Sequence, residues 1–166
     1  PSGEITNLPY LREISKYNKP VIISTGMAEM FEIDEALQVF LRKGLSKRNI
    51  FILHCTTQYP AAKEEVNLKA MISIGNQFKT QVGYSDHTEG IDISLSAVSM
   101  GAKIIEKHIT LDKNLKGPDH KASIEPKQFK EMINSIRNIE KAMGNGIKFP
   151  TDSEKEIKKL VRKSIV

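Results

Sequence analysis

Short apolar runs alternate with longer amphipathic segments along this chain. The apolar runs are rich in Val, Ile and Leu, and they begin near Val21, Ile50, Val82 and Ile104. Continuous runs of this kind are typical of strands that are buried on both faces of a parallel sheet. Their spacing, roughly 30 residues or a little less, is the length of one strand followed by one helix. The pattern therefore predicts four consecutive strand–helix units in an α/β fold.

The segments between and after the strands place their apolar residues at helical spacing. Asn7 can cap the first helix, and Gly44 and Gly144 end two others. We expect helices at residues 8–17, 31–43, 68–78, 91–100 and 126–143, and a charged helical tail at 153–166. In that tail, Leu160 and Val161 suggest one packing edge. In the helix at 126–143 the apolar positions are Phe129, Met132, Ile133, Ile136, Ile139 and Met143.

Each predicted strand begins apolar and ends in a polar cluster. The clusters follow the strands as Ser24-Thr25, His54-Cys55-Thr56-Thr57, Ser85-Asp86-His87 and Glu106-Lys107-His108. In parallel α/β folds the active site lies at the carboxyl ends of the strands. A complete (β/α)₈ barrel needs about 250 residues. With 166 residues, the chain is predicted to form about half of such a barrel, or a small open sheet.

His87 and His108 end two predicted neighbouring strands. Side chains alternate along a strand, so Ser85 points the same way as His87, and Glu106 the same way as His108. Neighbouring strands lie about 4.8 Å apart, so a metal ion bound by imidazole nitrogens would fit between the two rings. Such a site leaves positions open for water and a substrate oxygen. The alternative is that the histidines are ordinary hydrogen-bonded pocket residues.

Other polar residues at the strand ends allow two interpretations each. The hydroxyls of Ser24, Thr25, Thr56, Thr57 and Ser85 would form a phosphate cradle, or would cap the following helices. Glu106 would act on a sugar hydroxyl or as an acid or base, or would pair with a lysine. Asp119 and His120 lie on a Gly-Pro loop, which would cover a substrate or be an ordinary turn. We interpret His54 as a core histidine and Cys55 as a packing residue, and we expect Lys107 to face the helices.

The composition narrows the class of protein. The net charge of +5 comes without aromatic interleaving, so it suits anionic substrates better than nucleic acid. A single cysteine suits a reducing compartment. No apolar run approaches the ~18 residues of a membrane helix, and no secretory signal is visible. We therefore expect a cytoplasmic protein without membrane or nucleic-acid partners. Because the chain starts Pro-Ser-Gly without Met, we expect it to be a piece of a longer protein.

Six motifs, in this order along the chain, resemble those of the sialic acid synthase family, which makes N-acetylneuraminate, legionaminate and pseudaminate. They are PSGEITNLPYL, IISTGMA, LHCTTQYP, GYSDHT, IIEKHITLDK and GPDHKASIEP. The resemblance implies the C-terminal half of a (β/α)₈ TIM barrel at residues 1–150. It implies that 151–166 is a linker towards an antifreeze-like domain that is absent here. It also implies that earlier strands carry further site residues.

The family reaction condenses phosphoenolpyruvate with an N-acetylated hexosamine such as N-acetylmannosamine, giving a nine-carbon 2-keto acid and phosphate. The resemblance implies that His87 and His108 hold a divalent metal, usually Mn²⁺, with Mg²⁺ or Co²⁺ as alternatives. Glu106 and His108 would be catalytic. The residues implied to contact phosphoenolpyruvate are Ser2, Ser24, Thr57 and Ser85, and those implied to face the aminosugar are Tyr59, Glu106 and Asp119. The family also implies a homodimer.

Two other interpretations stay open from the sequence. The chain would be a non-catalytic half-barrel that serves in binding or assembly, or a truncated gene product. It would also be compatible with an unrelated phosphate-binding lyase or aldolase, although no obvious Schiff-base lysine stands at a strand end. If the family assignment is right, the 166 residues by themselves should be inactive.

Overall fold

The computed structural model describes residues 1–117 and 119–162. Pro118 of the expected polar loop and the last four residues of the expected tail lie outside the described residues. The strands form one parallel sheet in the order β1-β2-β3-β4, with bounds Val21–Ser24, Ile50–Cys55, Gln81–Asp86 and Ile105–Lys107. The four predicted strands are therefore confirmed, each within two residues of its expected start.

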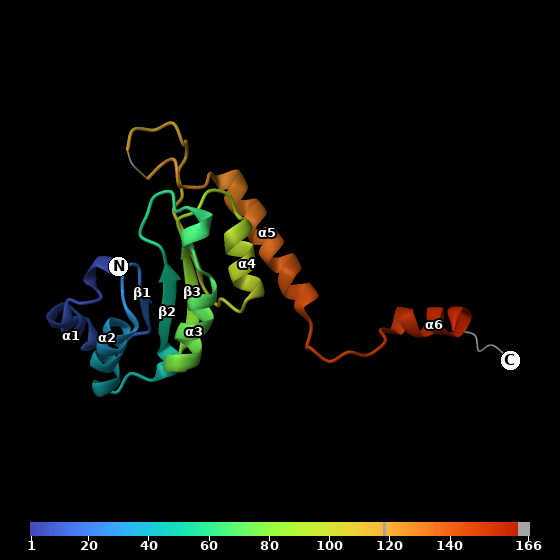
Figure 1. Cartoon of the computed structure of the whole chain (residues 1–166), viewed down its shortest axis with the longest axis horizontal. Coiled ribbons are helices and arrows are strands. Elements are labelled where there is room, and N and C mark those ends of the chain that lie inside the picture. The colour runs from blue at the N-terminus through green and yellow to red at the C-terminus, as the bar shows by residue number, and fades with distance from the viewer. Residues whose placement is uncertain (118, 163–166) are drawn as a thin grey trace.

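Helices alternate with the strands (Figure 1). The α-helices are α1 (Leu8–Ser15), α2 (Met30–Arg42), α3 (Lys69–Phe78), α4 (Asp92–Ser99), α5 (Pro126–Met143) and α6 (Asp152–Val161). Short 3-10 turns are η1 (Ser2–Glu4), η2 (Lys47–Asn49) and η3 (Lys63–Glu65). The predicted caps form: the Asn7 side chain accepts from the Tyr10 N–H, and α5 ends at Gly144.

The helix-covered side of the sheet forms the core. Strand residues such as Ile23, Ile50 and Ile52 pack there against Leu37 and Phe40 of α2. A second cluster joins Tyr84 of β3 to Val66 and Met71, which precede the strand, and to Ala97 of α4, which follows it. Burying one such side chain contributes roughly 1.5–3 kcal/mol. This packing fixes which strand residues face the helices and hence which face the opposite side.

The register places equivalent residues of neighbouring strands in rows. Cys55 pairs with Ser85, and Ser85 pairs with Glu106, so these side chains share the face opposite the helices. Asp86 pairs with Lys107 one residue further along, on the helix-covered side. The alternation therefore turns Lys107 towards the helices, as predicted from the sequence.

Two expectations about burial are wrong. Ile22 of β1 is 54% exposed, although its strand was expected to be buried on both faces, because no described element covers its outer face. Leu160 and Val161 of α6 are 73% and 69% exposed, so the expected packing edge meets no described partner. The predicted helix α5 forms, with Met132 buried and Phe129, Ile133 and Met143 exposed.

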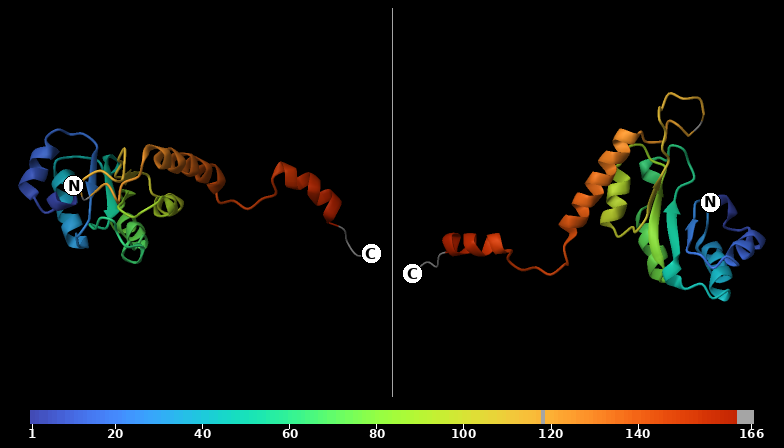
Figure 2. Two further views of the ribbon diagram at one scale, coloured as in Figure 1. Left: turned by 90° about the horizontal axis from the view of Figure 1, so that it is seen from above. Right: turned by 180° about the vertical axis from the view of Figure 1, so that it is seen from behind.

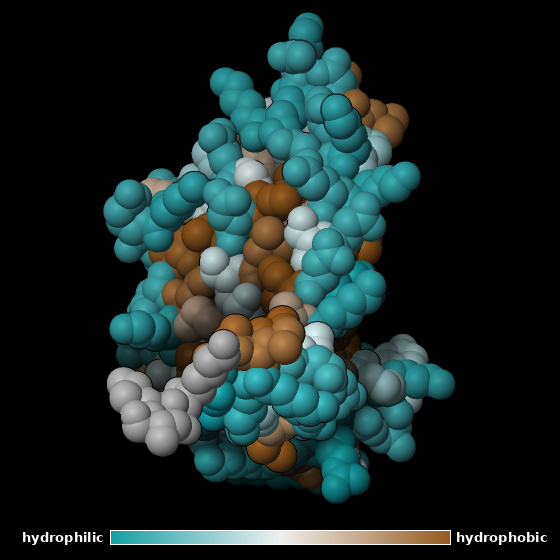
Figure 3. All heavy atoms as spheres, turned by 90° about the vertical axis from the view of Figure 1, so that its right-hand side faces the viewer, coloured by the Kyte–Doolittle hydropathy of each residue, from teal (hydrophilic) through white to brown (hydrophobic). Residues whose placement is uncertain are grey.

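The C-terminal helix stands apart from the sheet. Figures 1 and 2 show α6 at the end of an extended segment that leaves α5 and leads away from the strands. The face seen from that side is largely hydrophilic, with an apolar band near its centre (Figure 3). Within the described residues, no helix combines the length and apolar character that crossing a bilayer requires.

Candidate active site at the carboxyl ends of the strands

The polar side chains that end β3 and β4 come together at the carboxyl edge of the sheet. The buried Ser85 hydroxyl donates a 2.7 Å hydrogen bond to Oε1 of Glu106. The same hydroxyl lies 3.5 Å from Nε2 of His87. The structure therefore brings Ser85, His87 and Glu106 into one group, as the alternation along the strands predicted.

His87 is held by the segment that follows β2. Its Nδ1 lies 2.7 Å from the Thr56 carbonyl oxygen, and since a carbonyl only accepts, Nδ1 carries the proton. The His87 carbonyl in turn accepts from the Ala61 N–H at 2.9 Å. This leaves the lone pair of Nε2 free on the side where Ser85 lies. Metal-binding histidines typically donate their other ring N–H to a carbonyl or carboxylate oxygen in this way.

Tyr59 and His108 complete the aromatic part of the site. The ring centroids of His87 and His108 are 5.3 Å apart and meet nearly edge to face. The Tyr59 ring lies 4.2 Å from the His87 ring and 5.2 Å from the His108 ring. Burial raises the pKa of the Tyr59 hydroxyl, with smaller contributions from Cys55, Asp119 and Glu106. Tyr59 therefore borders both imidazoles. The feature of the sequence that pointed to Tyr59 was only the Tyr-Pro turn.

Asp119 reaches the same place from the long loop after β4. Its Oδ2 lies 3.9 Å from Nδ1 of His108, beyond hydrogen-bonding distance but close enough for an electrostatic attraction to a protonated ring. His120 is turned away, since its Nδ1 lies 2.7 Å from the Thr110 hydroxyl. The loop thus brings one of its two candidate residues to the histidine pair.

The residues present fit a divalent transition metal in their donor chemistry. Neutral imidazole is a common ligand for such ions, and the two ring centroids are 5.3 Å apart with one ring nitrogen of His87 left free. Among residues 1–117 and 119–162, no group of three or more His, Cys, Asp or Glu side chains is arranged to hold a metal ion. The two histidines would therefore need further ligands from water, substrate or residues outside this group.

A second polar group lies at the ends of β1 and β2. The Ser2 hydroxyl accepts a 2.9 Å hydrogen bond from the Gly26 N–H and lies 3.3 Å from the Cys55 sulfur. A Cβ atom on Gly26 would stand 2.0 Å from Oγ1 of Thr57. Ser24, the last residue of β1, is half-buried and lies two residues before Gly26. Three of the predicted phosphoenolpyruvate contacts, Ser2, Ser24 and Thr57, thus lie around the tight turn at Gly26.

Two hydroxyls of the expected cradle serve the fold instead. The buried Thr25 hydroxyl donates to the Leu53 carbonyl at 2.9 Å, and the Thr56 hydroxyl lies 3.4 Å from the Glu65 carbonyl oxygen. For Thr25 and Thr56 the alternative of capping the following helix is therefore wrong, because the N-cap residues of α2 and α3 are Glu29 and Leu68. Thr56 still contributes to the site, but through its backbone carbonyl, which a residue pattern does not reveal.

Contacts also bear on the other candidate residues. Among the described residues Glu106 forms no ion pair, and its carboxylate accepts the Ser85 hydroxyl instead. Nε2 of His54 lies 2.7 Å from the Val66 carbonyl oxygen, so the interpretation of a satisfied histidine is confirmed. Cys55 is buried, as expected of a packing residue.

Sequence reasoning missed one polar network next to the site. Asp86 and Lys107 form an ion pair at 3.0 Å with both side chains fully buried. Burial lowers the pKa of Lys107, and the neighbouring Asp86 carboxylate opposes that shift. Asp86 and Lys107 point to the same face of neighbouring strands, which the alternation along each strand could have shown. Their pairing, however, depends on the register between the two strands, which the spacing of residues in the sequence does not give.

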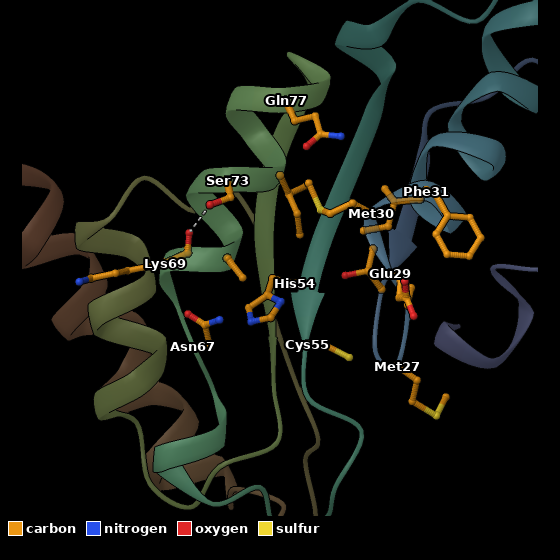
Figure 4. Close-up of a pocket in the computed structure, with 15 residues that line it drawn as sticks. Met27, Glu29, Met30, Phe31, His54, Cys55, Asn67, Lys69, Ser73 and Gln77 are labelled. Atoms are coloured by element: carbon orange, nitrogen blue, oxygen red, sulfur yellow. Dashed lines mark hydrogen bonds between the residues drawn. The ribbon is translucent and has the colours of Figure 1, made fainter.

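A hollow between α2 and α3 lies apart from this site. It has a volume of about 780 Å³, and its lining residues include His54, Asn67 and Lys69 (Figure 4). None of Ser85, His87, Glu106 or His108 lines it. The strand-end group is the better candidate, because it contains the converging hydrogen-bonded and ionisable side chains.

The fold and site together define an α/β half-barrel whose polar residues gather at the carboxyl ends of parallel strands. The model of the NeuB family matches residues 1–148, and the chain belongs to that family. The resemblance to sialic acid synthases is therefore confirmed.

Named relatives agree with this family. The N,N'-diacetyllegionaminic acid synthase of Campylobacter jejuni is 60% identical over 166 residues, which is 100% of this chain and 50% of that protein. The human N-acetylneuraminate-9-phosphate synthase is 40% identical, across 99% of this chain and 45% of that protein. The chain thus spans about half the length of these relatives.

A solved structure supports the fold. The N-acetylneuraminic acid synthetase of Leptospira borgpetersenii, in complex with citrate, superposes with a TM-score of 0.85 at 36% identity, covering 98% of this chain and 57% of that one. A truncated 3-deoxy-D-arabino-heptulosonate 7-phosphate synthase from Thermotoga maritima has a TM-score of 0.70 at 20% identity, which concerns the fold alone.

Proposed function

We propose that the complete gene product containing this chain is a nonulosonic acid synthase. It condenses phosphoenolpyruvate with an N-acetylated hexosamine and yields a nine-carbon 2-keto acid and phosphate. The observation that carries the proposal is the convergence of Ser85, His87, Glu106 and His108 at one edge of the sheet. Membership of the NeuB family supports the same reaction class.

The named relatives support one aminosugar over the other in this proposal. The relative at 60% identity makes N,N'-diacetyllegionaminic acid. Because phosphoenolpyruvate supplies three carbons of a nine-carbon product, the acceptor is a six-carbon sugar, and the name of the product implies two N-acetyl groups on it. A diacetamido hexose is therefore the favoured acceptor, with N-acetylmannosamine as the alternative.

One carbon–carbon bond forms in this reaction, and one carbon–oxygen bond to the phosphate breaks. The enol carbon of phosphoenolpyruvate forms a bond to the aldehyde carbon of the open-chain sugar. Water adds to the carbon that bears the phosphate, and inorganic phosphate leaves by C–O cleavage. The bridging oxygen therefore departs with the phosphate, and the new keto oxygen comes from water.

The residues of this chain have separate roles in that reaction. His87 and His108 would hold a divalent ion, with Mn²⁺ preferred over Mg²⁺ or Co²⁺, and a bound ion supplies Lewis-acid polarisation of the sugar carbonyl. Glu106, oriented by Ser85, exchanges a proton with the sugar hydroxyl or aldehyde oxygen. The group of Ser2, Ser24 and Thr57 around Gly26 binds the phosphate and carboxylate of phosphoenolpyruvate, and Asp119 and Tyr59 face the sugar.

The larger assembly is part of the same proposal. Residues 1–150 belong to the catalytic barrel, and 151–166 lead to the following domain. We propose a cytoplasmic homodimer, supported by the single cysteine and by the exposed apolar residues of α6.

Product analysis tests the function. The complete gene product is incubated with Mn²⁺, each aminosugar and phosphoenolpyruvate labelled with ¹⁸O at the bridging position. The proposal expects labelled phosphate and a nine-carbon keto acid, both abolished by EDTA and restored by Mn²⁺. Absence of phosphate release with every acceptor would contradict it, and would favour a binding or assembly role for the half-barrel.

A further inference from the structure

A buried polar network connects the strand end that carries His87 to the strand end that carries His108. The Lys107 ammonium contacts Oδ2 of Asp86 at 3.0 Å and donates to the Thr88 carbonyl at 2.7 Å. Asp86 and Thr88 are the two neighbours of His87, and Lys107 immediately precedes His108. One ammonium group therefore ties both histidine-bearing segments together.

The carboxylate of Asp86 is the centre of this network. Its Oδ1 accepts from the Thr88 N–H at 2.9 Å and from the Thr88 hydroxyl at 2.8 Å. Its Oδ2 accepts from the Ser94 hydroxyl of α4 at 2.6 Å, in addition to the Lys107 ammonium. Asp86, Thr88 and Ser94 are all fully buried. The turn that presents His87 is therefore fixed on both sides of the histidine.

Stability alone is a weak reason for such a pair. The cost of removing two charges from water offsets most of the free energy of their mutual attraction. Proteins in which a buried ion pair is replaced by apolar residues are therefore often equally stable. The ammonium here also makes a directional contact to a backbone carbonyl next to His87. That contact fixes the position of the Thr88 backbone relative to Lys107. An apolar residue at position 107 would not provide it.

We propose that Lys107 is a positioning residue, which acts through Asp86 and Thr88 to set the mutual geometry of the His87 and His108 rings. The inference about the rings stands on the contacts above, and its consequence for metal binding rests on the proposed function. Lys107 itself faces the helices and does not touch substrate.

The test compares Lys107→Met with Lys103→Met in the complete gene product. Lys103 is exposed, lies just before β4 and forms no side-chain ion pair among the described residues, so it is the matched control. Two measurements are made on each variant. Nitrogen-15 NMR in EDTA reports the tautomer of the His87 ring, and electron paramagnetic resonance of free Mn²⁺ gives the Kd for the ion.

The wild type and Lys103→Met are expected to show His87 protonated at Nδ1, as its bond to Thr56 requires. Lys107→Met is expected to show a mixture of tautomers and a Kd for Mn²⁺ raised by about 10–100-fold, the usual effect of losing an outer hydrogen-bond partner. A pure Nδ1–H tautomer together with a Kd within about twofold of wild type, below the resolution of that effect, would overturn the inference.

A second variant covers the case in which Lys107→Met fails to fold, since it leaves the Asp86 charge unpaired. Asp86→Asn combined with Lys107→Met removes both charges and keeps an acceptor for Thr88. The same tautomer mixture and weakened Mn²⁺ binding are expected, and wild-type values in both measurements would overturn the inference.

The two proposals fail in different ways. If the wild type itself binds no Mn²⁺, the metal site of the proposed function is wrong, and the NMR comparison alone decides the role of Lys107. If the wild type binds Mn²⁺ and both Lys107 variants match it in both measurements, the positioning role is wrong and the proposed function stands.

Discussion

The Ser85 hydroxyl on β3 donates a 2.7 Å hydrogen bond to the Glu106 carboxylate on β4, its partner in the sheet register. Glu106 is exposed to solvent, and among the described residues this is the hydrogen bond that orients its carboxylate. The contact also connects the two strands that carry His87 and His108. Orientation of the proposed acid–base group thus depends on a neighbouring strand rather than on its own.

Removing this hydroxyl should slow the reaction. A hydrogen bond to a charged group contributes about 1.5–3 kcal/mol, so we expect Ser85→Ala to lower kcat/KM by roughly 10–150-fold. Steady-state phosphate release measures the effect. Ser99→Ala is the control, because Ser99 bonds only to a carbonyl of its own helix. Equal kcat/KM for Ser85→Ala and wild type would show that Glu106 needs no such orientation.

Gly26 is expected to be essential for binding phosphoenolpyruvate. A Cβ there would approach Thr57 Oγ1 to 2.0 Å, Cys55 Sγ to 2.8 Å and Ser2 Oγ to 2.9 Å, so side chains of the proposed cradle must move. Displacements of about 1 Å in such groups can cost about 10²-fold in rate.

We therefore expect Gly26→Ala to lower kcat/KM for phosphoenolpyruvate by about that factor while the KM for the aminosugar changes little. Gly3→Ala is the matched control, since a Cβ on Gly3 meets no atom within 4 Å. Wild-type kinetics in Gly26→Ala would place phosphoenolpyruvate elsewhere.

Tyr84 offers a prediction about stability and pH. Its hydroxyl is buried and has no hydrogen-bond partner among the described residues. Burial, then the charges of Asp86 and Cys55, raise the pKa of this hydroxyl. The folded state therefore holds the proton more tightly than the unfolded state, so this contribution to stability is present below the unfolded pKa of about 10 and is lost as pH rises above it.

Replacing Tyr84 with Phe removes both effects. We expect the free energy of unfolding at about pH 8 to rise by roughly 1 kcal/mol, because an unsatisfied buried group is removed. We also expect a smaller loss of stability between about pH 8 and about pH 11 than in wild type. Urea unfolding measures both, with the exposed Tyr17→Phe as control. A destabilised Tyr84→Phe would mean that the hydroxyl has a partner.

Much of the fold and site follows from local rules. Apolar runs predicted the strands. The alternation of side chains along a strand predicted that Ser85 shares a face with His87, and Glu106 with His108, because the direction of a side chain depends only on its position in its own strand. The pairing of Asp86 with Lys107 needed the register, and the role of the Thr56 carbonyl needed the path of a loop. Side-chain patterns carry no information about backbone acceptors.

Burial was the least predictable feature. The apolar residues Ile22 and Leu160 were expected to pack, but both are exposed because no described element covers them. An apolar pattern indicates that burial of a face would be favourable in free energy. It does not identify the element or partner that buries that face. For the same reason the apolar spacing predicted the helix α5 without telling which of its apolar residues are buried.

Equilibrium binding of Mn²⁺ to the complete gene product tests the central assignment most directly. Electron paramagnetic resonance of free Mn²⁺ is compared for wild type, His87→Ala and His108→Ala. His54→Ala is the control, because its ring bonds to the Val66 carbonyl on the helix-covered side of the sheet. We expect one bound Mn²⁺ per chain in wild type and His54→Ala, and loss of that binding in both His87→Ala and His108→Ala. Undiminished binding of Mn²⁺ in His87→Ala and His108→Ala would contradict the metal site between these two rings.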